Sequence, residues 1–132
     1  MNRDGLLARF GRNAPAVESS IEGLQAKLGF RLPPDYVEFL RGTNGGEGFV
    51  GNSYLVLWRA EELLEKNSAY HVAEFAPGLF LIGSDGADEA FGFDTRSEVT
   101  PIVRVPFIGM DARECRLLAS DFGAFLRRLS ES

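Results

Sequence analysis

The sequence is poor in the residue types that build metal centres and disulfide frameworks. Its 132 residues include one cysteine, Cys115, and one histidine, His71. A single cysteine excludes a disulfide within the chain, and a structural zinc site needs about four cysteine or histidine ligands. One cysteine and one histidine are also a poor basis for nucleophilic catalysis. We therefore expect no metal and no cofactor, and we expect Cys115 to be a buried or half-buried thiol.

Long apolar runs and an excess of basic residues are missing as well. No apolar stretch approaches the roughly 20 residues that a membrane-spanning helix needs, and residues 1–13 lack the apolar core of a signal peptide. The chain carries 19 acidic and 14 basic residues, a net charge of −5. Nucleic-acid-binding proteins carry basic patches, so this balance disfavours a nucleic-acid partner. We expect a cytoplasmic protein with no membrane association, whose acidity serves solubility or suits a basic partner.

The composition that remains is typical of one folded domain. Hydrophobic residues make up 45% of the sequence and charged residues 25%. A chain of this length is normally a single domain, and it can bury about two-thirds of the surface that its unfolded state exposes. We expect a domain at residues 15–132, preceded by a loosely attached arm at residues 1–14. Leu6, Leu7 and Phe10 would let this arm dock as a short helix.

Apolar residues recur at helical spacing in four segments. We predict helices near residues 17–28, 34–42, 59–75 and 119–132. Val17 belongs to the apolar face of the first helix, and Pro34 suits the first turn of the second. The third helix is expected to break near Asn67, and Ser120 is expected to cap the fourth.

Between these helices the periodicity changes to that of strands. Strands are predicted within residues 47–58, around a turn at Gly51–Asn52, and at residues 79–84, 89–94, 101–105 and 113–119. Most connections between strands are short, which favours antiparallel pairing. The fold class is therefore α+β, a largely antiparallel sheet with helices packed on it.

The segment IGSDGADEAFGFD, at residues 82–94, concentrates the candidate functional residues. Its carboxylates are Asp85, Asp88, Glu89 and Asp94. An EF-hand loop beginning at the first of them would place Ala87 at a ligand position and Ala90 at the obligatory glycine, which disfavours a calcium site. A catalytic acid pair needs a cleft and one desolvated member, and no neighbouring histidine or lysine would relay protons. Neither chemistry is favoured.

A β-hairpin explains the same segment better. Asp85–Gly86 favours a bend, because glycine adopts positive φ without strain. Alternation after the bend places Phe91 and Phe93 in the core. Gly92 then leaves a gap on the opposite face, where another backbone or side chain can approach.

Two motifs in this order resemble one family. LPPDYVEFLRGTNGG (32–46) resembles an LP-x-D-Y/F-x-x-F-L…NGG signature, and LFLIGSDGADEAFGFD (79–94) resembles an IGSDGGGE-x-aromatic-x-aromatic-D hairpin. VPF (105–107) and ASDFGAFLRRL (119–129) resemble the family's last strand region and terminal helix. Over residues 17–130 the chain thus resembles the SUKH superfamily, in the branch named after the yeast Smi/Knr cell-wall-assembly regulators. It departs from the commonest hairpin in having Ala87-Asp88 where two glycines are frequent.

The resemblance implies an α+β fold without catalytic activity. Bacterial members are mostly immunity proteins that bind and block a cognate polymorphic or contact-dependent toxin, often a nuclease or deaminase, whereas fungal members are regulatory scaffolds. We expect an immunity protein that neutralises a basic toxin domain; the alternative is a regulatory scaffold or interaction module of a cellular assembly.

The expected binding face lies around the hairpin. It comprises Asp85, Asp88, Glu89 and Asp94, with Glu47 and Trp58 as neighbours. The carboxylates are either a solvated edge or the face that meets the partner. Trp58 is either packed in the core or an exposed interface anchor.

Overall fold

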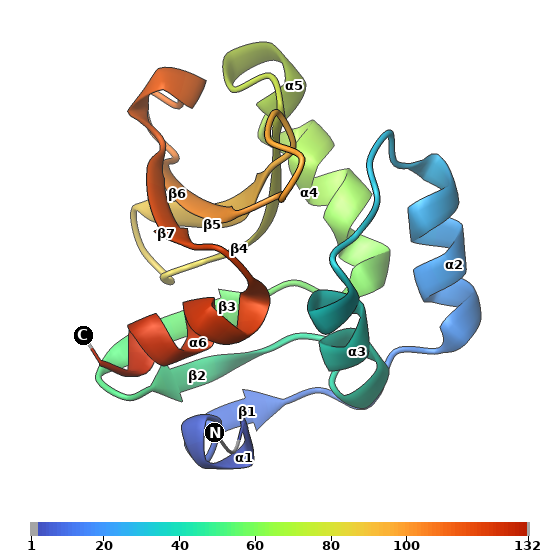
Figure 1. Ribbon diagram of the computed structural model, residues 1–132, viewed down its shortest axis with the longest axis vertical. Helices are drawn as coiled ribbons and strands as arrows, with labels where there is room; N and C mark the ends of the chain where they lie inside the picture. Colours follow the sequence, from blue (N-terminus) through green and yellow to red (C-terminus); the bar gives the residue numbers. More distant parts are fainter. Residues whose placement is uncertain (1–2, 132) are drawn as a thin grey trace.

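The computed structural model describes residues 3–131, with side chains from residue 5 onward, so residues 1–2 of the predicted arm and residue 132 of the predicted domain lie outside it. Within this range seven strands form one antiparallel sheet, and helices pack on it (Figure 1). The fold is α+β, as predicted.

The elements follow one another in the order α1 (Arg3–Leu6), β1 (Phe10–Arg12), α2 (Glu18–Lys27), α3 (Pro34–Gly42), β2 (Gly46–Val50), β3 (Ser53–Leu57), η1 (Ala60–Glu62), α4 (Leu63–Ala69), α5 (Val72–Phe75), β4 (Leu79–Ser84), β5 (Glu89–Asp94), β6 (Ile102–Pro106), η2 (Ala112–Glu114), β7 (Arg116–Ala119) and α6 (Phe122–Ser130). The order of the strands in the sheet is their order in the sequence. Both predicted hairpins, β2–β3 and β4–β5, are confirmed.

The sheet begins with a strand that the hydrophobic pattern did not predict. Phe10–Arg12 pairs antiparallel with β2, and Leu7 and Phe10 are buried. A short helix is present, but it ends at Leu6 and this strand follows it. Three residues are too few for an alternating pattern to be recognised.

Aromatic contacts fill the space between the sheet and helices α3 and α6. The Phe91 ring lies 5.1 Å from that of Phe125 in α6, and Phe93 lies 5.2 Å from Tyr36 in α3. Both phenylalanines are buried, as predicted. Another backbone approaches at Gly92, as predicted, because a Cβ there would lie 2.5 Å from the Phe80 carbonyl oxygen on β4.

Three predicted helix details are wrong. Val17 precedes α2 as its N-cap and is 63% exposed, so it does not belong to the buried face. The residue that caps α6 is Asp121 rather than Ser120, because its carboxylate accepts a hydrogen bond from the Ala124 N–H. The break between α4 and α5 falls at His71, whose φ is 54°, and not at Asn67.

Asn67 instead joins α4 to the sheet. Strand β3 pairs with β4 at Val56↔Ser84 and Leu57↔Gly83, and Leu81 lies beyond these pairs. There the Asn67 amide donates to the Leu81 carbonyl (2.9 Å) and accepts from the Leu81 N–H (2.8 Å). The side chain thus supplies β4 with the two hydrogen bonds that a neighbouring strand would make.

Asn44, from the NGG part of the first motif, ties three segments together. Its side-chain carbonyl accepts from the Ala60 N–H (2.8 Å), and its amide donates to Glu61 (2.9 Å). Its backbone carbonyl accepts from the Asn13 side chain (3.0 Å). Gly45 follows with φ of +74°, at a point where a Cβ would overlap the Leu57 carbonyl oxygen. This motif therefore positions the entry into the β2–β3 hairpin.

Candidate functional site

The β2–β3 hairpin turns one set of its side chains toward solvent. Glu47 pairs with Val56 across the two strands, and Phe49 pairs with Tyr54. Phe49 is 40% exposed. The intervening residues, such as Leu55, are fully buried, and Figure 1 shows α6 lying across this hairpin, against β2. Glu47 and Phe49 are exposed, and Tyr54 and Val56 are half-buried. We call this set, Glu47, Phe49, Tyr54 and Val56, the platform.

The platform residues contact one another. The Phe49 and Tyr54 rings pack edge to face, with centroids 5.1 Å apart. The Tyr54 hydroxyl donates a hydrogen bond of 2.6 Å to Glu47, and this bond raises the pKa of Tyr54 above its usual value. The Arg9 guanidinium lies over the Phe49 ring, 4.9 Å from its centroid. The platform is thus a preformed aromatic and acidic surface.

The β4–β5 turn borders the platform. Gly86, with φ of +82°, comes so close that a Cβ would lie 2.9 Å from the Tyr54 ring. Asp85 shapes the turn, because its carboxylate accepts from the backbone N–H groups of Ala87 (2.8 Å) and Glu89 (3.2 Å). Asp88 at the tip of the turn is exposed. Two of the predicted site residues, Asp85 and Asp88, therefore belong to the turn that borders the platform; the Asp88 carbonyl accepts from the Phe107 N–H, on the β6 side of that turn.

Trp58 lies at the end of β3 and is only 7% exposed. Its ring stacks on Tyr70 at 6.0 Å, and Lys66 lies 5.7 Å from its centroid. A shallow pocket of about 350 Å³ is lined by Trp58, Glu47 and Val56, among others. The ring is thus packed rather than exposed, although it lies at the border of the platform.

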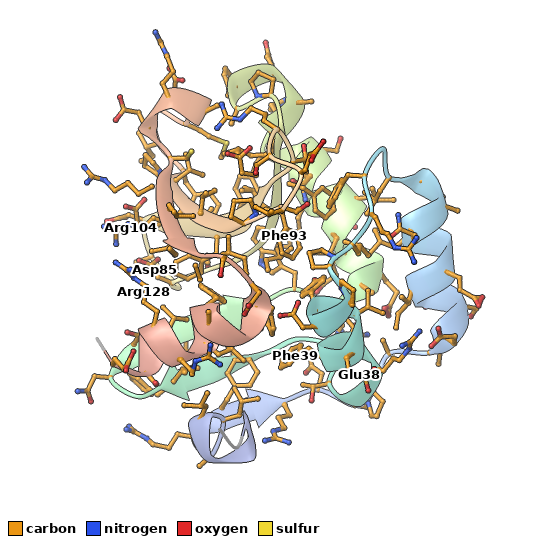
Figure 2. All side chains as sticks on the ribbon, in the orientation of Figure 1. Glu38, Phe39, Asp85, Phe93, Arg104 and Arg128 are labelled. Atoms are coloured by element: carbon orange, nitrogen blue, oxygen red, sulfur yellow. The ribbon has the colours of Figure 1, made fainter. Side chains whose placement is uncertain are left out.

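Glu89 faces a different pocket, of about 390 Å³, which Asp85, Arg104 and Arg128 also line. Figure 2 shows Asp85, Arg104 and Arg128 along the same side of the molecule. Glu89 Oε1 lies 4.0 Å from Arg104 Nε, and its Oε2 is shielded from solvent without a hydrogen-bond partner in the described structure. The carboxylates here are accompanied by arginines, so this side carries both signs of charge.

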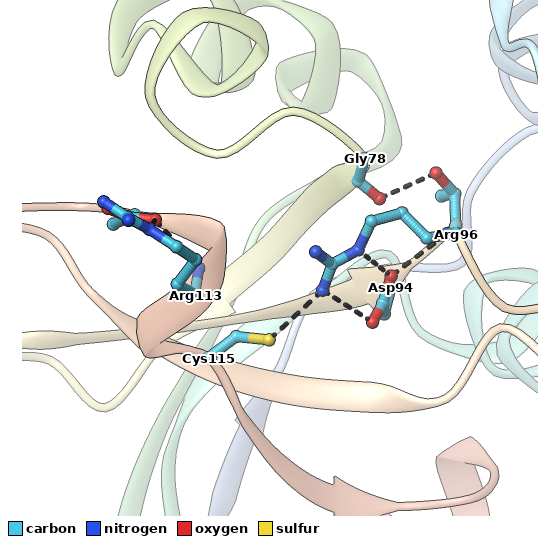
Figure 3. A network of polar contacts seen from close by, with 7 residues as sticks. Gly78, Asp94, Arg96, Arg113 and Cys115 are labelled. Carbon is cyan, nitrogen blue, oxygen red and sulfur yellow. Dashed lines mark hydrogen bonds and ion pairs between the residues drawn. The ribbon is translucent and has the colours of Figure 1, made fainter.

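Asp94 lies apart from the other predicted residues, at the far end of β5, about 17 Å along the strand from the turn. Arg96 pairs with it through two bonds, Nε to Oδ1 (2.9 Å) and Nη2 to Oδ2 (3.0 Å) (Figure 3). This pairing lowers the pKa of the Asp94 carboxyl. The half-buried Cys115 sulfur accepts a contact from the same guanidinium at 3.5 Å.

Sequence reasoning missed Arg9, Phe49 and Tyr54. Phenylalanine is by default a core residue, and the pattern of residues 46–50 does not show which face is covered. The sequence did contain one indication. Glu47 and Phe49 are two residues apart in a strand, so their side chains point to the same face of the sheet.

Among residues 3–131, no cluster of three or more histidine, cysteine or acidic side chains is placed to hold a metal ion. The same residues include no helix with the length and apolarity to cross a membrane.

The chain matches the sequence model of the family described as SMI1 / KNR4 family (SUKH-1) over residues 15–128. It is also similar to a Bacillus subtilis (strain 168) protein named "Uncharacterized protein YnaB", with 40% identity over 76 residues. That stretch covers 58% of the chain and 49% of the relative, so the chain spans about half the length of this relative.

Proposed function

Because the chain belongs to the SMI1/KNR4 family (SUKH-1), we propose that it is a non-enzymatic immunity protein, which binds a cognate toxin domain of nuclease or deaminase type and blocks it. The observation that supports this most directly is the platform. It combines an aromatic pair, the exposed Phe49 and the half-buried Tyr54, with the Glu47 carboxylate and with Asp85 and Asp88 in the adjoining turn.

This composition suits a protein-binding surface. Aromatic side chains are enriched at the centre of interfaces, where a few residues carry most of the binding energy, and charged residues around them set encounter rate and partner choice. A toxin that acts on nucleic acid has a basic active-site face, because it must hold phosphates. The carboxylates around the platform, and the net charge of −5, favour encounter with such a face.

The protein would then inhibit the toxin by covering its active site. The platform is carried by two paired strands, and the Asp85 turn beside it is fixed by its own hydrogen bonds. A rigid surface loses little conformational entropy on binding. An interface of ordinary size covers about 800 Å² per partner, roughly a tenth of the 7105 Å² surface of this protein. That area is sufficient to shield a toxin's catalytic cleft.

The proposal predicts that a neighbouring gene encodes the toxin. The test is co-expression with the toxin domain of such a gene, followed by measurement of growth and of association kinetics. The double variant Glu47→Lys with Asp88→Lys should slow association at least tenfold at low salt and abolish rescue. The matched control is Glu22→Lys with Glu98→Lys, which changes net charge equally at two exposed positions, on α2 and in the β5–β6 connection. Equal loss in both variants would show that only net charge matters, and failure of the unaltered protein to rescue growth would overturn the immunity function.

A further inference from the structure

The platform already holds a guanidinium, which the chain itself provides. Arg9 precedes β1, and its guanidinium carbon lies 4.9 Å from the centroid of the Phe49 ring. Its Nη1 is 3.5 Å from the Gly51 carbonyl oxygen, at the limit of a hydrogen bond, and the side chain is exposed. Arg9 is therefore weakly held by groups that face solvent.

A second cation on this side of the molecule is held differently. Lys66 lies 5.7 Å from the centroid of Trp58, but that ring is only 7% exposed, whereas Phe49 is 40% exposed. Lys66 belongs to helix α4, which packs against the sheet. The ring of Phe49 is therefore much more accessible to an external group than that of Trp58.

The surroundings of Phe49 suit a planar cation. A guanidinium binds to an aromatic face through the ring's quadrupole, and it forms hydrogen bonds with carboxylates and carbonyls around its edge. Glu47 is held on the same face by Tyr54 (2.6 Å), and the Gly51 carbonyl already meets one guanidinium nitrogen. The ring and the carbonyl contact a guanidinium already, and the carboxylate lies on the same face of the hairpin, so this part of the platform suits an arginine side chain.

We propose that Phe49, with Tyr54 and Glu47 beside it, forms the receptor for an arginine of the partner, and that Arg9 covers the Phe49 ring of this receptor in the free protein. Arg9 must leave when the partner's arginine enters, so it acts as an internal competitor. The identification of the partner as a toxin rests on the proposed function. The affinity of the receptor for a guanidinium does not depend on it.

Removing Arg9 should therefore strengthen binding of an external guanidinium. The probe is N-acetyl-arginine amide, with the neutral N-acetyl-citrulline amide as its isosteric control, titrated at 0.15 M salt while the NMR signals of the Phe49 and Tyr54 rings are followed. In Arg9→Gln the dissociation constant of the arginine probe should fall about two- to fivefold. Citrulline should not produce saturable shifts.

Two variants make this test specific. Lys66→Gln removes a positive charge from the Trp58 ring instead. We expect the dissociation constant of the arginine probe for this variant to stay within about 1.5-fold of that of the unaltered protein, because the cation–π contact at Phe49 is not changed. Phe49→Leu, added to Arg9→Gln, should abolish the gain. Thermal unfolding checks that each variant is folded, and Arg9→Met, which also removes the charge, replaces Arg9→Gln should the latter not fold.

The outcomes separate this inference from the proposed function. An unchanged dissociation constant in Arg9→Gln, an equal gain in Lys66→Gln, or equal shifts with citrulline would each overturn the receptor. A gain that depends on Phe49, in a protein that rescues no toxin, would support the receptor and overturn the immunity function.

Discussion

The Asp35 carboxylate in the first turn of α3 accepts a hydrogen bond of 2.9 Å from the backbone N–H of Phe122, the first residue of α6. Gly123 donates to the same oxygen at 3.2 Å, and Asp121 accepts from Ala124 at 2.7 Å. Two carboxylates thus satisfy three N–H groups that a helix N-terminus leaves without partners. One of them comes from the aspartate of the first sequence motif, so that motif joins two helices far apart in the chain.

Asp35→Ala should lower the free energy of unfolding by about 1 to 3 kcal/mol, because two N–H groups lose their acceptor in a partly buried place. Asp35→Asn should lose less, since its carbonyl still accepts. Urea unfolding measures both. Asp121→Ala is the control and should cost about 1 kcal/mol as an ordinary cap. A loss below about 0.5 kcal/mol for Asp35→Ala would show that the link does not stabilise the fold.

Asn67→Ala should also destabilise the protein, by about 2 to 3 kcal/mol, because it leaves both polar backbone groups of Leu81 without partners. Asn67→Asp should cost at least as much, since a carboxylate cannot donate to the carbonyls of Leu81 and Leu63. Ser68→Ala, at the exposed next position, should stay within about 0.5 kcal/mol. Hydrogen exchange at the Leu81 amide gives an independent measurement, and unchanged protection would contradict the role.

Two glycine substitutions should act in opposite directions. Gly45→Ala forces a side chain onto a φ of +74° and into the Leu57 carbonyl, so we expect a loss of at least about 2 kcal/mol. Gly23→Ala, inside α2 with open space around it, should gain about 0.5 to 1 kcal/mol. Thermal melts of the two variants give the comparison. A stabilised Gly45→Ala would show that the entry into β2 is not constrained as described.

The sequence was sufficient to predict those elements in which the hydrophobic pattern repeats several times within the element. The β4–β5 hairpin and the buried stripe of α6 follow from alternation and helical spacing. Strand β1 did not follow, because its three residues are recognised only through pairing with β2. The cap of α6 was misplaced by one residue, since Ser120 and Asp121 are both good N-caps and only the backbone angles distinguish them.

The candidate site was predicted only in part, for a geometric reason. The sequence predicts Glu47, which lies on the platform, and Asp85 and Asp88, which lie in the turn that borders it. Asp94 is close to them in sequence, but the six-residue strand β5 lies between the turn and Asp94 and places this carboxylate far from the turn. Arg104 was not considered, and it faces the Glu89 pocket because it pairs with Phe91 across β5 and β6. Such neighbours depend on strand register, which periodicity does not give.

Asp94→Asn should reduce stability at neutral pH and have less effect in acid. Arg96 depresses the folded-state pKa of this carboxyl below the ordinary 3.8. A depressed pKa stabilises the fold above the unfolded value, and that contribution is lost as the pH falls through the folded value. The gap between wild type and variant should therefore narrow below about pH 4. Urea midpoints across pH measure it, and a constant gap would contradict the ion pair's contribution.

The control for that series is Asp111→Asn. Asp111 has a pKa of about 2, lowered by its hydrogen bond to Arg113, yet the pair is open to solvent, with Arg113 87% exposed. Solvent-exposed ion pairs contribute little. We therefore expect a smaller change at neutral pH than for Asp94→Asn, which is paired while only 16% exposed.

A sheet whose spatial order equals its sequence order has a kinetic consequence. Each strand pairs with strands next to it in the chain. The β2–β3 and β4–β5 hairpins can close over short loops at a small entropy cost, whereas the β1–β2 and β3–β4 pairings close over segments that contain helices. The bond between Asp35 and Phe122 spans 87 residues, so we expect the contact between α3 and α6 to form late in folding. In stopped-flow experiments Asp35→Ala should therefore raise the unfolding rate and leave the refolding rate nearly unchanged.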